Sequence, residues 1–121
     1  MKSIVVTGGA GFIGSHLVEL LVKNNYDVTV IDNLSTGNEA SLIKVRDKIT
    51  FLEIDITNKH LLGHTLAKAD GIVHLAARTS VPESIKDPSP YITTNVLGTQ
   101  LLLSTAHRIK TSQVVLASSA A

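Results

Sequence analysis

Apolar runs and amphipathic segments alternate along the whole 121-residue chain. Each run is short and rich in valine, isoleucine or leucine, which is typical of strands buried on both faces of a parallel sheet. We expect five strands, at residues 2–7, 27–31, 49–54, 71–75 and 113–117. The segments between them predict helices at residues 12–24, 39–46, 57–67 and 90–108, and a helical turn at residues 83–86.

Capping residues and apolar stripes define the predicted helices. We expect Thr57 to cap the third helix and Ser89 to cap the last one, with Pro90 in its first position. Asn95 is polar within the apolar-flanked part of the last helix, so its side chain needs a buried partner or solvent. The apolar stripe of the first helix consists of Ile13, Leu17, Leu20 and Leu21. That of the last helix consists of Ile92, Val96, Thr99 and Leu103, and it is widened by Leu97, Leu101 and Leu102.

Strands that alternate with helices through short loops predict an α/β fold with a doubly wound parallel sheet. The expected strand order is 3-2-1-4-5, that of a Rossmann fold. A ligand crevice then lies where the first and fourth strands diverge, at their carboxyl ends. We treat residues 1–121 as one domain.

The junction of the first strand and first helix reads Thr-Gly-Gly-Ala-Gly-Phe-Ile-Gly over residues 7–14. In such a loop Gly8 permits a tight turn, Gly11 lets the backbone approach a pyrophosphate, and Gly14 brings the helix close to the strand. The helix N-terminus then directs free N–H groups at the phosphates. This pattern predicts dinucleotide binding, the alternative being a purely structural turn.

Asp32 ends the second strand, 18 residues after Gly14 (32 − 14 = 18). A carboxylate near this spacing accepts hydrogen bonds from the adenosine ribose and repels a 2′-phosphate, which favours NAD over NADP. The alternative is that Asp32 only caps a turn. In the same topology Asp55 is expected to meet the exocyclic amine of adenine, and Ile56 to pack on the ring.

Composition removes several classes of function. A net charge of +1 gives no electrostatic reason to bind nucleic acid or a membrane surface, and the absence of cysteine excludes thiolate chemistry. No signal peptide or membrane span is recognisable, so we expect a cytoplasmic protein. His60 and His64 stand four residues apart but have no third ligand nearby, so no metal site is predicted.

Several motifs together resemble the extended short-chain dehydrogenase/reductase family, and within it nucleotide-sugar epimerases of the UDP-glucose 4-epimerase type. The resemblance spans the whole chain. It rests on residues 7–14, 32–37, 55–56, 74–77, 81–88, 95–99 and 118–121.

The resemblance implies NAD as cofactor, a nucleotide sugar as substrate, and transient hydride transfer at C4 of the sugar. Ser119 matches the serine that assists a catalytic tyrosine. Small residues after the fourth strand would let the backbone run under the cofactor. Cofactor contacts, or their supports, are implied at Gly8, Gly11, Phe12, Ile13, Gly14, Asp32, Asn33, Ser35, Gly37, Asp55, Ile56, Ala76, Ala77 and Asn95. We also expect a homo-oligomer, formed through residues 114–116 or the helix at residues 90–108.

The chain departs from the family at the catalytic pair Tyr-x-x-x-Lys. Its two tyrosines, Tyr26 and Tyr91, are followed four residues later by Val30 and Asn95. We therefore expect a truncated, N-terminal cofactor-binding part that lacks the substrate domain and is inactive alone. The alternatives are a stand-alone dinucleotide-binding or interaction module without catalysis, and a fragment of a nucleotide-sugar 4,6-dehydratase.

Overall fold

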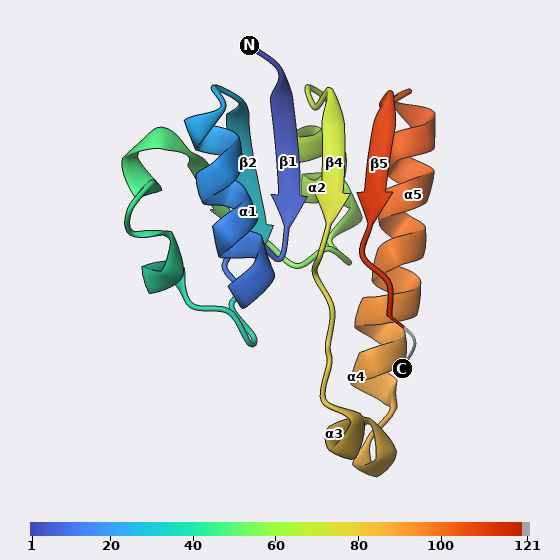
Figure 1. Cartoon of the computed structure of the whole chain (residues 1–121). Helices are drawn as coiled ribbons and strands as arrows, with labels where there is room; N and C mark the ends of the chain where they lie inside the picture. Colours follow the sequence, from blue (N-terminus) through green and yellow to red (C-terminus); the bar gives the residue numbers. More distant parts are fainter. Residues whose placement is uncertain (120–121) are drawn as a thin grey trace.

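A five-stranded parallel sheet forms the centre of the molecule (Figure 1), in a computed structural model that describes residues 1–119. The strand order is β3-β2-β1-β4-β5, which confirms the predicted 3-2-1-4-5 order and the Rossmann-like α/β fold. The strands are β1 (Ser3–Thr7), β2 (Asp27–Asp32), β3 (Thr50–Glu53), β4 (Gly71–His74) and β5 (Gln113–Leu116).

Helices cover both faces of the sheet, with α1 on one side and α2 and α5 on the other (Figure 1). Within residues 1–119 no helix is both long and apolar enough to cross a membrane. The helical elements are α1 (Phe12–Lys23), η1 (Glu39–Leu42), η2 (Arg46–Lys48), α2 (Lys59–Leu66), α3 (Val81–Lys86), α4 (Ser89–Tyr91), η3 (Ile92–Gly98) and α5 (Thr99–Arg108).

Alternate residues of the central strands enter two separate cores. Val5 and Ile31 pack with α2 and α5, whereas their neighbours Val6 and Val30 pack with α1. All four side chains are at most 1% exposed. This burial on both faces explains why the strands are almost continuously apolar rather than alternating.

Three predicted helix starts or lengths are wrong. Asn58, not Thr57, caps α2, and its side chain accepts a hydrogen bond from the Leu61 amide. Ser89 lies inside the first turn of α4, which Pro88 precedes, and it makes no side-chain cap. The helix predicted at residues 39–46 is replaced by two short 3₁₀-helices, η1 and η2.

The helix predicted at residues 90–108 is continuous but not uniform, because η3 is a π-helix between α4 and α5. Part of the predicted stripe faces outward instead of into the core: Ile92 is 57% and Val96 64% exposed, whereas Leu102, at the widened side of the stripe, is fully buried. Two members of the first helix's stripe, Ile13 and Leu20, are likewise exposed. The spacing of apolar residues identified these helices but not the sides that pack on the sheet.

Candidate cofactor-binding site

A cleft of about 560 Å³ opens at the carboxyl ends of the strands, where β1 and β4 diverge. It is lined by the phosphate-loop residues Gly8, Gly11, Phe12, Ile13 and Gly14, by Asp32, Asn33, Ser35 and Gly37 after β2, by Asp55 and Ile56 after β3, by Ala76 and Ala77 after β4, and by Ser119 after β5. The structure thus brings together every predicted site residue except Asn95.

The glycine loop turns tightly between β1 and α1. Gly8 has φ +70°, and its amide donates to the carbonyl oxygen of Ile31 at 2.8 Å. A Cβ at Gly14 would clash with the Gly8 carbonyl oxygen, so only glycine lets α1 begin this close to the turn. No side chain caps the N-terminus of α1, and the N–H groups of its first turn are therefore available to an anion.

Asp32 joins the glycine loop to the turn that follows β2. The side chain is 8% exposed, and its Oδ2 accepts from the Ala10 amide at 3.0 Å while Oδ1 accepts from the Leu34 amide at 2.8 Å. Leu34 adopts a left-handed conformation, with φ 58°. Asp32 therefore does cap a turn, as the alternative interpretation held. Each carboxylate oxygen can accept a further hydrogen bond, so this capping does not preclude a ribose contact.

Asp55 lies just after β3, where a network of hydrogen bonds favours the ionised form of its carboxyl group. Its Oδ1 accepts from the Thr57 hydroxyl at 2.6 Å and the Thr57 amide at 2.9 Å, and its Oδ2 accepts from Asn33 Nδ2 at 2.9 Å. The Thr57 hydroxyl contributes most to a lowered pKa of Asp55, with smaller help from the Thr57 amide, Asn33 and the charge of Arg78, against the opposing effect of burial. The carboxylate remains an acceptor at neutral pH.

Asn95 supports the cleft from outside rather than lining it. Its Oδ1 accepts from the Arg78 amide at 2.9 Å, and its Nδ2 donates to the Arg78 carbonyl at 3.0 Å. This pair fixes the loop that leaves β4, and it supplies the partner that Asn95 was expected to need. The neighbouring Thr94 does line the cleft.

Three threonines in the cleft lining, Thr36, Thr79 and Thr94, were not identified from the sequence. Thr36 lies within the motif at residues 32–37. Nothing in the apolar pattern marks Thr79, which lies in the loop after β4, or Thr94, which lies in the π-helix η3. Residues 120 and 121, which close the family motif, lie outside the described residues. Within residues 1–119 no three His, Asp or Glu side chains gather as a metal site would require.

The cleft combines the features that a dinucleotide requires. Its volume lies within the range of about 300–1,000 Å³ usual for ligand sites. Glycine occupies the positions where a Cβ would fill the turn, uncapped amides face an anion position, and two carboxylates offer acceptors. Backbone amides at a helix N-terminus suit a pyrophosphate, and carboxylates suit sugar hydroxyls and an exocyclic amine.

Comparison with known proteins decides the family. The family model "NAD dependent epimerase/dehydratase family" matches residues 4–121. The chain belongs to this family. Among curated members of the epimerase/dehydratase family, a UDP-glucose 4-epimerase of Lacticaseibacillus casei is 41% identical over 121 residues, which cover 98% of this chain and 36% of that protein. A dTDP-glucose 4,6-dehydratase of Mycolicibacterium smegmatis is 40% identical over 108 residues, covering 87% of this chain and 33% of that protein.

A solved structure extends the similarity to three dimensions. The crystal structure of UDP-glucose 4-epimerase from Brucella ovis in complex with NAD matches with a TM-score of 0.90 and 39% identity, covering 99% of this chain and 36% of that one. The chain therefore spans about a third of the length of these relatives. It corresponds to the NAD-binding N-terminal portion of the epimerase/dehydratase family.

Proposed function

We propose that this chain is the cofactor-binding part of a nucleotide-sugar 4-epimerase of the UDP-glucose type, and that its cleft binds NAD. The observation that carries the proposal is the convergence of the glycine loop, Asp32 and Asp55 on one cleft. The similarity to epimerases, including one solved with NAD, supports the same assignment.

Each part of the cleft has a distinct task under this proposal. The amides of residues 12–14 hold the pyrophosphate, Asp32 accepts from the adenosine ribose, and Asp55 with Ile56 receives the adenine. Ser119 lies at the other side of the cleft, after β5, where it would hydrogen-bond the reacting sugar oxygen. When bound, NAD supplies reversible hydride transfer.

A 4,6-dehydratase part is the second candidate, because one such enzyme is 40% identical over 108 residues. The two candidates share the cofactor cleft and differ in their chemistry on the sugar. The Asn-Leu-Ser-Thr-Gly sequence at residues 33–37 favours the epimerase. We also propose that the 121-residue polypeptide alone does not epimerise UDP-glucose, because neither of its tyrosines begins a Tyr-x-x-x-Lys pair that could remove the hydroxyl proton.

Calorimetric titration of the chain with NAD and NADP tests the cofactor assignment. We expect NAD to bind more tightly than NADP. Replacement of Gly14 by alanine should abolish binding, because the added Cβ clashes with the Gly8 carbonyl oxygen. Gly63→Ala is the matched control, since there the added Cβ would meet only the flexible end of Arg108, at 3.3 Å.

Asp32→Asn removes the charge and one of the two acceptor oxygens, so it tests the ribose contact together with the bonds that the carboxylate accepts from the Ala10 and Leu34 amides. We expect NAD affinity to fall by about tenfold, the value of one hydrogen bond to a charged group, and the preference over NADP to shrink. Equal affinities of the wild-type and Asp32→Asn proteins for both cofactors would contradict the role of Asp32. Conversion of UDP-glucose to UDP-galactose by the purified chain would contradict the predicted inactivity.

A further inference from the structure

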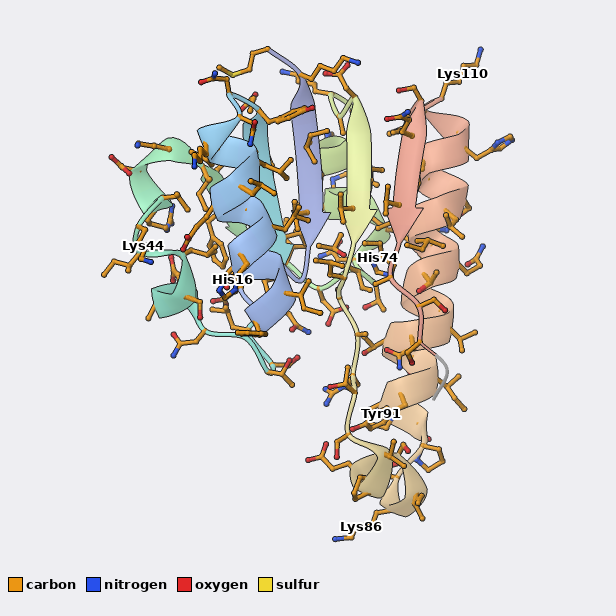
Figure 2. All side chains as sticks on the ribbon, viewed as in Figure 1. His16, Lys44, His74, Lys86, Tyr91 and Lys110 are labelled. Atoms are coloured by element: carbon orange, nitrogen blue, oxygen red, sulfur yellow. The ribbon has the colours of Figure 1, made fainter. Side chains whose placement is uncertain are left out.

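Three side chains that are distant in sequence form a hydrogen-bonded chain beneath the cleft. Thr7, the last residue of β1, has its Oγ1 2.6 Å from Nδ1 of His74, the last residue of β4. The other ring nitrogen, Nε2, lies 3.0 Å from Oγ1 of Thr99, the first residue of α5. Thr7 is fully buried and His74 is 6% exposed. Figure 2 shows His74 at the carboxyl end of the sheet.

The Thr7 hydroxyl also satisfies the backbone where β4 leaves the sheet. Its oxygen accepts from the amides of Leu75 and Ala76, each at 3.1 Å, and the Leu75 amide is shared with the Thr7 carbonyl oxygen, also at 3.1 Å. A hydroxyl oxygen has two lone pairs, and these two amides, one of them shared with the Thr7 carbonyl, are directed at both. The hydroxyl hydrogen is left as a donor, and among the residues that the structure describes its acceptor is Nδ1 of His74, at 2.6 Å from Oγ1.

This count of protons fixes the state of the imidazole. Nδ1 must accept, so His74 is neutral, carries its hydrogen on Nε2 and donates it to Thr99 Oγ1. The opposite tautomer, or an imidazolium, would bring a third donor to the Thr7 oxygen and leave the hydroxyl hydrogen without an acceptor. Burial, which lowers the pKa of His74, acts in the same direction.

The network reaches the cleft through the backbone. Ala76 lines the cleft, and its amide is so close to the glycine loop that a Cβ at Gly8 would lie 2.7 Å from the Ala76 nitrogen. The backbone that follows β4 therefore still lies in contact with the glycine loop that follows β1. Within the described residues neither Thr7 nor His74 lines the cleft, so any influence on a ligand passes through the position of Leu75 and Ala76.

We propose that His74 is a positioning residue for the cofactor cleft: locked as the neutral Nε2–H tautomer, it orients the Thr7 hydroxyl, which holds the Leu75 and Ala76 amides against the glycine loop. The functional part rests on the proposed NAD site, whereas the tautomer does not. The imidazole takes no part in hydride or proton transfer. The contact of its Nε2 with Thr99 links the end of β4 to the start of α5.

Long-range ¹⁵N–¹H NMR of the wild-type chain at pH 7.5 without NAD tests the tautomer directly. The expected spectrum assigns the His74 hydrogen to Nε2 and leaves Nδ1 unprotonated. An Nδ1–H tautomer or an imidazolium would overturn the proposal. This measurement does not depend on cofactor binding, so its outcome is separate from that of the NAD titration.

Two substitutions test the positioning role. His74→Leu removes the acceptor, and we expect amide hydrogen exchange at Ala76 to accelerate by about tenfold and NAD affinity to fall by a similar factor. His74→Asn places an oxygen near the position of Nδ1, and exchange and affinity should return to within about threefold of wild type. His60→Leu, at an exposed histidine of α2, is the matched control and should change neither quantity.

Unchanged exchange at Ala76 in a folded His74→Leu protein would refute the role, as would equal damage from the leucine and asparagine variants. If His74→Leu does not fold, the wild-type tautomer and the asparagine variant still decide the question. Failure of the wild-type chain to bind NAD at all would contradict the proposed function while leaving the tautomer and exchange results intact.

Discussion

The sheet and the helical arm at residues 81–98 use similar side chains in opposite ways. In the sheet Val6, Val28 and Val30 are completely buried, whereas in the arm Ile85 is 79% and Val96 64% exposed. Figure 1 shows the arm, which comprises α3, α4 and η3, extending past the carboxyl edge of the sheet. Apolar residues therefore identify a helix or strand, but they do not show whether other residues of this chain cover its apolar side.

Polar contacts nevertheless fasten the arm beside the cleft. Asn95 holds both backbone polar groups of Arg78, and Thr94 beside it reaches the cleft lining. The sheet therefore provides a packed scaffold, while the arm provides polar contacts to the site and an apolar outer surface. Exposed apolar surface of this kind is typical of sites that contact more protein.

The largest difference between the two regions should appear when the same leucine truncation is made in each. Leu102→Ala, in the buried part of α5, is expected to cost about 2–5 kcal/mol because it leaves a cavity. Leu97→Ala, at a side chain 45% exposed in the arm, should cost less than about 1 kcal/mol. Urea unfolding monitored by circular dichroism measures both, and equal losses would contradict the division into core and arm.

The second prediction concerns acid stability and His74. Burial lowers the pKa of His74 in the folded chain below the ordinary histidine value of about 6.5. Between the folded pKa and this value, the unfolded chain therefore binds more protons than the folded chain does. Stability is then fully present above about pH 6.5 and falls as the pH drops towards the folded pKa, with a slope of at most about 1.4 kcal/mol per pH unit. Unfolding curves between pH 5 and 8 measure the slope.

The His74→Asn protein serves as the reference for that slope, because asparagine does not titrate. It should lose less stability between pH 6.5 and pH 5.5 than the wild-type chain does. Parallel pH profiles of the two proteins would show that the acid sensitivity arises elsewhere.

A smaller effect is expected where the arm is fastened. Asn95→Ala removes both hydrogen bonds to Arg78 and should cost about 1 kcal/mol, with faster hydrogen exchange at the Arg78 amide. Thr93→Ala, at the exposed position two residues earlier, is the control and should leave exchange at Arg78 unchanged. If the Arg78 amide stays protected without Asn95, the loop is held by other contacts.

The smallest effect on folding is expected at the outer surface of the arm. Combined Ile92→Ser and Val96→Ser substitutions should change the free energy of unfolding by less than about 0.5 kcal/mol per site, because both side chains are exposed. The same change should reduce the self-association that we predict for this surface. Sedimentation of both proteins at high concentration measures it, and a monomeric wild-type chain would remove the basis for the expectation.

The strands and the glycine loop could be predicted because their signals are local. Each strand is a short apolar run, and the functions of Gly8 and Gly14 follow from spacing within eight residues. The positions of Asp32 and Asp55 in the cleft lining could also be predicted, since strand ends of a doubly wound sheet meet at one edge. The helical pattern at residues 39–46 predicted one helix, whereas two short 3₁₀-helices, η1 and η2, form in this region.

Other features depend on contacts that no local pattern contains. The bond between Thr7 and His74 spans 67 residues, and the bond from His74 to Thr99 spans 25. The outward orientation of Ile92 and Val96 differs from the prediction because a period of 3.6 does not hold through η3.

The π-helical segment also determines how the arm tolerates changes in chain length. A π-turn closes from residue i to i+5 and so contains one residue more than an α-turn, as if a residue had been inserted. The wider turn absorbs this extra residue, so the helical segments on either side keep their relative orientation. Deletion of one residue within Ile92–Gly98 would therefore let the segment close as an ordinary α-helix, with Leu102 still in the core and the arm still pointing in the same direction. The same deletion in α5, where each residue accounts for about 100° of rotation, would turn the preceding helix by that angle.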